Sequence, residues 1–183
     1  SRDWTGPNAP LMLPNDDPGP SSQPRSTRLR PVSYSVPMQF GTAAHGLDYR
    51  PRPTAFGLVV HEGKLACVRV DRGEGSYFDL PGGAVDGDET EEQAVVREFL
   101  EETGMTVRPL ARIAEASQYF RKSDGEAINN IGGFWIAEQL ALNPTAKVEA
   151  DHDLVWLDPH QALAQLRHDA HSWAVTVWLR RHA

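Results

Sequence analysis

Residues 80–104, with the sequence LPGGAVDGDETEEQAVVREFLEETG, predict one helix with defined ends and so decide much of the fold. Thr90 is followed three residues later by Gln93, which is the spacing of a capping box at a helix N-terminus. Gly104 stands where helices commonly end in a left-handed residue. We therefore expect a helix between Thr90 and Gly104, preceded by a turn that contains two adjacent glycines.

The predicted helix carries its acidic residues on one face. At about 100° per residue, one arc of about 100° holds four carboxylates: Glu91, Glu98, Glu101 and Glu102. Like charges three or four positions apart repel, and no lysine occurs between Lys64 and Lys122 to relieve that repulsion. The spacing alone leaves two interpretations open. The stripe is either a site for a hard divalent cation, which prefers oxygen ligands, or a solvated acidic helix face.

A longer pattern favours the first interpretation. Gly83, Glu89 and the run REFLEETGM at residues 97–105 fit the pattern G-x5-E-x7-R-E-U-x-E-E-x-G-U at every specified position, where U is a bulky apolar residue. This pattern is the Nudix box, so the sequence resembles the Nudix (MutT-like) hydrolase family. The resemblance implies an α/β/α sandwich around a mixed sheet. It also implies cleavage of a nucleoside diphosphate that is linked to another group.

The resemblance also implies roles for individual residues. Glu98, Glu101 and Glu102 would bind Mg²⁺ or Mn²⁺, with the Gly82 carbonyl as a further ligand, and Arg97 would pair with Glu89 and orient the carboxylates. A divalent cation there neutralises charge on phosphorus and lowers the pKa of a bound water. Glu98 is the leading candidate for the general base. Family members differ in this respect, and three acids before the last expected strand are the alternatives: Glu149, Asp151 and Asp153.

The substrate is less well defined by the sequence. Tyr119 and Phe120 could stack on a base, and Arg121 or Lys122 could contact a phosphate. Asn129 and Asn130 could read a base edge or form a turn. The histidines His152, His168 and His171 are expected at the surface or at helix caps.

We expect a nucleoside or deoxynucleoside triphosphate to be cleaved to the monophosphate and pyrophosphate. ADP-ribose or nucleotide-sugar cleavage is the first alternative. A non-catalytic nucleotide sensor is the second, although the intact glutamates of the box argue against it.

Composition limits the remaining possibilities. The 183 residues carry a net charge of −7, which argues against binding to polymeric nucleic acid. No apolar run approaches the roughly 20 residues needed to span a bilayer, so no membrane association is expected. Cys67 is the only cysteine, which fits a cytoplasmic protein. The resemblance also makes a homodimer one expected assembly.

Two regions are expected along the chain. Residues 1–37 hold eight of the fourteen prolines and predict a flexible arm, whereas residues 38–183 would form the folded Nudix domain. Within that domain, residues 54–60 and 64–70 predict a hairpin that turns at Gly63. Further strands are expected at residues 77–80, 105–114, 128–140 and 154–157, and helices at 159–166 and 170–181. Strands in runs with few helices between them favour an α+β class.

Overall fold

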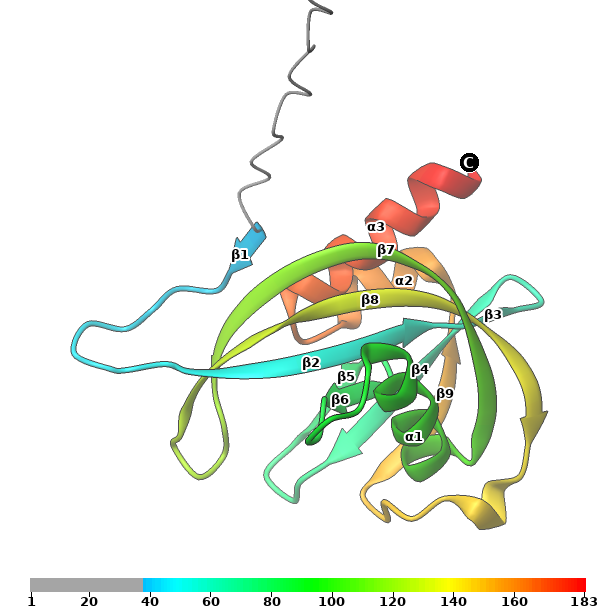
Figure 1. Ribbon diagram of the computed structural model, residues 1–183, viewed down its shortest axis with the longest axis horizontal. Helices are drawn as coiled ribbons and strands as arrows, with labels where there is room; N and C mark the ends of the chain where they lie inside the picture. Colours follow the sequence, from blue (N-terminus) through cyan, green and yellow to red (C-terminus); the bar gives the residue numbers. More distant parts are fainter. Residues whose placement is uncertain (1–37) are drawn as a thin grey trace, which may run out of the picture. The chain divides into compact units, whose positions relative to one another are not determined.

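The computed structural model describes residues 38–183, so the predicted arm at residues 1–37 lies outside the described part of the chain. The described chain forms two sheets and three α-helices (Figure 1). The elements are β1 (Met38–Phe40), β2 (Arg50–Leu58), β3 (Val60–His61), β4 (Lys64–Asp71), β5 (Ser76–Asp79), β6 (Gly82–Ala84), α1 (Glu91–Thr103), β7 (Met105–Arg121), β8 (Ala127–Leu142), the 3₁₀ turn η1 (Pro144–Ala146), β9 (His152–Leu157), α2 (Pro159–Gln165) and α3 (Asp169–His182).

The larger sheet has the strand order β1-β7-β8-β2-β6 and is mixed. The strands β7 and β8 form a long antiparallel hairpin, whereas β8 runs parallel to β2 and β1 runs parallel to β7. The parallel β2–β8 pair brings residues 50–58 beside residues 128–136, which are far away in the sequence. This pairing places Asn130 on β8 directly beside Arg52 on β2.

The smaller sheet is built around β4, which pairs with β3, β5 and β9. The expected hairpin between residues 54–60 and 64–70 is only partly correct. Glu62 and Gly63 both have positive φ, 49° and 74°, as a type I′ turn requires. However, strand pairing across that turn stops after two residue pairs. The strand β2 pairs instead with β8 and β6, and β4 with β9, because both strands are largely buried and each has partners from distant parts of the chain.

Helices cover both faces of the larger sheet. One core cluster joins α1 to β2 through Ala55, Val59, Val95 and Phe99. A second cluster joins the other face of β2 to α2 and α3, and includes Phe56, Leu58, Leu166 and Val175. Figure 1 shows α1 on one side of the β2–β8 pair and α2 with α3 on the other. The predicted α+β class and the α/β/α sandwich around a mixed sheet are thus confirmed.

The helix α1 has the ends that its sequence predicts. The Thr90 side chain accepts a hydrogen bond from the Gln93 backbone N–H, and the Gln93 side chain accepts one from the Thr90 backbone N–H. Gly104 adopts φ 74° at the C-terminal end. Local interactions define both ends of the helix. The residues between them therefore have regular helix geometry, which determines the face on which the carboxylates lie.

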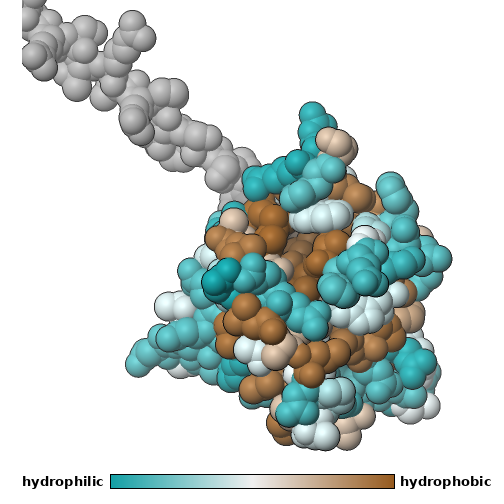
Figure 2. Space-filling model, turned by 90° about the vertical axis from the view of Figure 1, so that its right-hand side faces the viewer, coloured by the Kyte–Doolittle hydropathy of each residue, from teal (hydrophilic) through white to brown (hydrophobic). Residues whose placement is uncertain are grey.

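The outer surface of the described domain mixes polar and apolar residues (Figure 2). None of the helices between residues 38 and 183 combines the length and the apolar character needed to cross a bilayer.

Candidate active site

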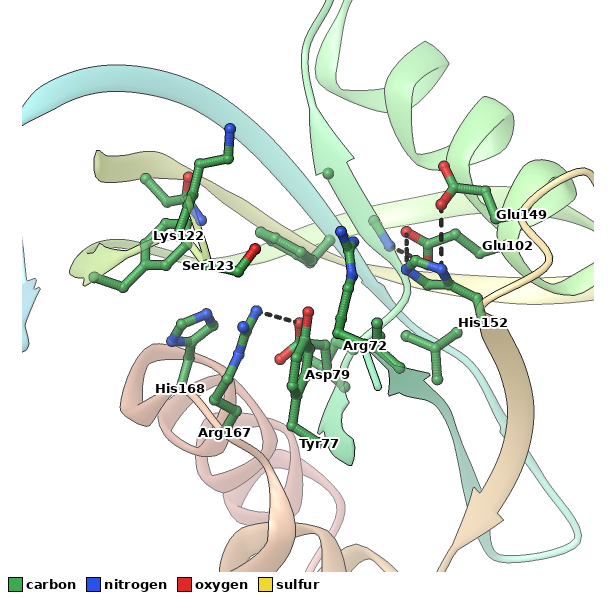
Figure 3. Close-up of a pocket in the computed structure, with 18 of the residues that line it drawn as sticks. Arg72, Tyr77, Asp79, Glu102, Lys122, Ser123, Glu149, His152, Arg167 and His168 are labelled. Carbon is green, nitrogen blue, oxygen red and sulfur yellow. Dashed lines mark hydrogen bonds and ion pairs between the residues drawn. The ribbon is translucent and has the colours of Figure 1, made fainter. Parts of the chain in front are cut away.

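One large cavity, of about 740 Å³, lies beside the N-terminal glycine turn of the Nudix box. Its lining comes from seven strands, from α1, and from several loops, including those between β4 and β5, between β7 and β8, before β9, and between α2 and α3. Figure 3 shows Glu102, Glu149 and His152 on one side of the cavity and Lys122, Ser123 and His168 on the other. Arg72, Tyr77, Asp79 and Arg167 lie between these two groups. The cavity therefore has an acidic end and a more basic end.

The acidic end is built on α1. Glu98 and Glu102 line the cavity and are 8% and 5% exposed, so most of each carboxylate is removed from water. A Cβ atom at Gly83 would lie 2.7 Å from Glu98 Oε1. The missing side chain at Gly83 therefore lets the Glu98 carboxylate lie against the backbone of β6. The Gly82 N–H donates to Glu102 Oε2 at 3.3 Å, which connects the glycine turn to the second buried carboxylate.

Arg97 holds several of these acids in place. Its guanidinium contacts both oxygens of Glu89, with the shorter contact at 2.6 Å, and it contacts Glu98 Oε1 at 2.9 Å and Glu101 Oε2 at 3.1 Å. It also donates to the Ala84 carbonyl at 2.9 Å. Each of Glu98 and Glu101 is contacted by Arg97 through one oxygen, so the second oxygen of each stays available for another partner.

The buried carboxylates are costly to ionise without a cation. Burial, followed by the charge of neighbouring Glu98, raises the pKa of Glu102 well above its usual value. Burial also raises the pKa of Glu98, although Arg97 opposes this effect. Positive charge close to both groups would favour their ionised forms.

The loop before β9 brings a further carboxylate to this end. Ligand oxygens of Glu98, Glu101 and Glu149 all lie within 4.8 Å of one another. Such an oxygen-only donor set suits a hard divalent cation such as Mg²⁺ or Mn²⁺. Glu102 does not belong to this group of three, and its Oε1 lies 4.0 Å from His152 Nε2. The residues present therefore fit a divalent cation, and Glu149 belongs to the group of three whereas Glu102 does not.

His152 connects the loop to the helix. It is 7% exposed, and its Nδ1 lies 2.8 Å from Asp151 Oδ1 and 3.1 Å from Glu149 Oε2. The expectation that His152 lies at the surface is thus wrong. No local sequence pattern indicates its burial, which depends on α1 and β9 packing side by side. The ring fixes Glu149 from one side, so it helps to define where that carboxylate points.

The centre of the cavity is formed by cationic and aromatic groups. The Arg167 guanidinium lies 3.6 Å from the centroid of the Tyr77 ring and pairs with Asp79 at 2.7 Å. Burial raises the pKa of Asp79 to about 6, although Arg167 opposes the shift. Arg72 and Arg52 also line the cavity. Sequence reasoning did not identify these residues, because they come from four separate elements and none belongs to a motif.

Of the three predicted substrate residues, Phe120 lines the cavity and the other two do not. The Tyr119 ring packs against Tyr49, with centroids 4.7 Å apart. Arg121 is exposed, and its Nη2 is 3.5 Å from the Gly125 carbonyl oxygen in the β7–β8 turn. Three successive residues of a strand cannot share one face, because side chains alternate. Tyr119 and Arg121 are therefore left out of the candidate site, whereas Lys122 lines it.

Two further histidines are buried rather than exposed. His168 is the N-cap residue of α3, so the expected helix-cap position is correct for it, whereas His171 lies within α3 and the expectation is wrong for it. His168 is 6% exposed and lines the cavity, and His171 is 2% exposed. Burial lowers the pKa of His168 to about 3 and holds that of His171 well below its usual value. His171 Nδ1 accepts a hydrogen bond from the Leu80 N–H at 3.2 Å, so the neutral ring has a structural role.

The buried His168 ring predicts a pH dependence of stability. The unfolded chain binds a proton at His168 near pH 6.5, whereas the folded protein resists protonation until about pH 3. Stability from this group is therefore lost as the pH falls below 6.5. We expect wild type to lose about 1.4 kcal/mol per pH unit relative to His168→Gln between about pH 6 and pH 4. Urea unfolding of both proteins at several pH values measures this. Parallel pH profiles would contradict it.

Comparison with known proteins agrees with this architecture. The sequence model of the NUDIX domain family matches residues 51–179 of this chain. A Bacillus subtilis (strain 168) protein, provisionally named an 8-oxo-dGTP diphosphatase, is 44% identical over 59 residues, which are 32% of this chain and 39% of that protein. A MutT-like protein of Streptomyces ambofaciens is 46% identical over 52 residues, or 28% of this chain and 32% of that one. The matched segments thus span well under half the length of these two relatives.

Solved structures share the fold across a larger part of the chain. A NUDIX hydrolase from Nitrosomonas europaea superposes with a TM-score of 0.62 at 19% identity, covering 72% of this chain and 90% of that one. The MutT protein from Methanosarcina mazei Go1 gives a TM-score of 0.60 at 22% identity, covering 74% and 98%. The family match over residues 51–179, together with the complete box on α1, shows that the chain belongs to the Nudix hydrolase family.

Proposed function

We propose that this protein is a divalent-metal-dependent pyrophosphohydrolase that cleaves a nucleoside or deoxynucleoside triphosphate to the monophosphate and pyrophosphate. The observation that carries the proposal is the composition of one cavity. Glu98, Glu102 and Glu149 lie at one end, and Arg52, Arg72, Lys122 and Arg167 line the rest. A triphosphate carries negative charge that needs both a cation at the acids and basic groups along its length. The partial identity to a protein named for 8-oxo-dGTP supports a nucleotide of this kind.

The acidic residues at this end of the cavity have different proposed roles. Glu98, Glu101 and Glu149 would hold Mg²⁺ or Mn²⁺, and the Gly82 carbonyl remains a proposed further ligand. Such a cation, when bound, neutralises charge on the phosphates and lowers the pKa of water. Glu102, which was also expected to bind the metal, lies outside this group of three and stays a proposed ligand, and the Gly82 N–H connects it to the glycine turn. Arg97 acts through the carboxylates, since its guanidinium contacts Glu98 and Glu101.

The reaction then needs one proton acceptor. A water molecule attacks one phosphorus of the phosphoanhydride, and its proton passes to a carboxylate, for which Glu98 is the first candidate. The P–O bond of the anhydride breaks, and the leaving phosphate oxygen keeps the bonding electrons. Glu149 is the second candidate base. His152 Nδ1 lies 3.1 Å from Glu149 Oε2, so one Glu149 oxygen is already engaged. Glu98 also has an oxygen engaged, by Arg97, which leaves one free oxygen on each candidate.

A substrate panel tests the proposal. The protein is incubated with Mg²⁺ and, separately, with deoxynucleoside triphosphates, 8-oxo-dGTP, ADP-ribose and nucleotide sugars, and the products are identified by chromatography. We expect monophosphate and pyrophosphate from at least one triphosphate, and no turnover once EDTA is added. Faster cleavage of ADP-ribose or of a nucleotide sugar would replace the substrate assignment. Tight binding of one nucleotide without turnover of any would indicate a sensor and contradict the catalytic proposal.

A further inference from the structure

Three of the residues that line the cavity have a buried side-chain atom with no hydrogen-bonding partner among residues 38–183: Asp79, Asn130 and His168. The Asp79 carboxylate pairs with Arg167 through its other oxygen, whereas the atoms of the other two residues are the side-chain oxygen Oδ1 of Asn130 and the ring nitrogen Nε2 of His168. Asn130 is 7% exposed and His168 is 6% exposed, and both residues line the cavity. A buried polar atom without a partner destabilises the fold, so such atoms are uncommon in folded proteins. Finding three of them in the lining of one cavity indicates that something binds there.

The neighbouring buried amide shows that the fold can satisfy such groups. Gln118 lies across from Asn130 in the β7–β8 register and is 8% exposed. Its Oε1 accepts from the Ala170 N–H at 3.1 Å, and its Nε2 donates to the Tyr119 carbonyl at 3.0 Å. Gln118 therefore connects β7 to the first turn of α3, while Asn130 beside it is left without a partner. The two residues share one face of the sheet, but only Asn130 lines the cavity.

Planar aromatic and guanidinium groups lie near Asn130 and His168. The Phe120 ring packs edge-on against His168, with centroids 5.0 Å apart, and Arg167 lies 5.7 Å from the Phe120 centroid. Arg52 is the neighbour of Asn130 on β2. Figure 3 shows His168 on the side of the cavity away from Glu102 and Glu149. A ligand that reaches from the carboxylates to His168 would thus carry phosphates at one end and meet planar side chains and unpartnered polar atoms at the other.

We propose that Asn130 and His168 bind the edge of a nucleobase and make the enzyme selective among bases. A base N–H donates to Asn130 Oδ1, and a second polar atom of the same base pairs with His168 Nε2. Phe120 and Arg167 offer planar surfaces beside the base. The proposal rests on the proposed function, because it requires a nucleotide in this cavity. It adds which residues distinguish one nucleotide from another.

Binding without turnover tests this proposal separately from hydrolysis. Calorimetry in EDTA measures the affinity of wild type for the five deoxynucleoside monophosphates with A, C, G, T and 8-oxo-G, and for deoxyribose 5-phosphate, which lacks a base. We expect at least one monophosphate to bind 10-fold or more tightly than the sugar phosphate. Asn130→Leu, and separately His168→Phe, should weaken that monophosphate by about 10- to 100-fold and leave deoxyribose 5-phosphate unchanged.

Gln139→Leu is the matched control. Gln139 Oε1 is also buried without a partner, but Gln139 does not line the cavity, so this variant should bind like wild type. If Asn130→Leu fails to fold, Asn130→Asp keeps the shape and replaces the amide N–H by an acceptor, which should change the order of affinity among the bases. Base preference that is unchanged in the folded Asn130 and His168 variants, or absent in wild type, would overturn the proposal. Neither result would decide whether the protein hydrolyses nucleotides, which the substrate panel tests separately.

Discussion

Replacing Glu98 by Gln is expected to lower kcat for the best triphosphate by about 10²- to 10⁴-fold, the range typical of a lost general base. The substitution keeps the size of the side chain, which matters because Glu98 is 8% exposed and lies against the backbone at Gly83. It removes one anionic oxygen from the group formed with Glu101 and Glu149. Steady-state kinetics at saturating Mg²⁺ measure the loss, and circular dichroism with thermal unfolding checks that the protein remains folded.

Two further variants distinguish the loss of a carboxylate inside the cavity from the loss of one negative charge elsewhere on α1. Glu102→Gln should also lower kcat strongly, since Glu102 lines the same cavity and accepts a hydrogen bond from the Gly82 N–H. Glu92→Gln makes the same change in charge on an exposed part of α1, outside the cavity, and should retain the wild-type kcat. If Glu98→Gln and Glu102→Gln both turned over at the full rate, the assignment of the α1 carboxylates would be wrong. An equal loss in Glu92→Gln would indicate an effect of net charge.

The parts of the fold that were predicted to the residue depend on local chemistry. The capping box at Thr90 and the left-handed Gly104 define α1 within its own sequence, so the face of its carboxylates followed from helix geometry alone. The turn at Gly63 was likewise visible, because a type I′ turn needs particular residues at two adjacent positions. Neither signal contains information about the strand with which β2 pairs. Its parallel partner β8 begins nearly seventy positions further along the chain, and no local pattern indicates this pairing.

In the candidate site, too, the local motif was predictable from the sequence and the contacts between distant parts of the chain were not. The carboxylates on α1 could be read from the sequence, whereas the remainder of the cavity comes from separate strands and from the loops that join the elements. The expected trio at residues 119–121 ignored the alternation of strand side chains, which brings Phe120 into the cavity and excludes its two neighbours. His152 and His168 were expected at the surface or at helix caps, and His168 does stand at the N-cap of α3, but both side chains are buried. Their burial is set by packing between elements that the sequence does not place together.

The packing that holds α1 against the sheet predicts the second large effect. Phe99→Ala is expected to lower the free energy of unfolding by about 3–5 kcal/mol, the cost of deleting a fully buried aromatic side chain. Phe99 is 0% exposed and packs with Ala55, Val95 and Met105. Urea unfolding at pH 7 measures the change. Leu100→Ala is the control on the same helix, because Leu100 is 39% exposed and its truncation should cost much less.

A glycine on β2 makes a more specific test of this packing. A Cβ atom at Gly57 would overlap the Phe99 ring, so the ring occupies the space that the glycine leaves. Gly57→Ala alone should therefore destabilise the protein, because an overpacked core commonly costs about 1–3 kcal/mol. In the Phe99→Ala background the added methyl group enters a cavity, so its cost should largely disappear and the two changes should be clearly non-additive. Additive free energies in this double-mutant cycle would show that the ring and the glycine are not in contact, and the account of how α1 is seated on β2 would fail.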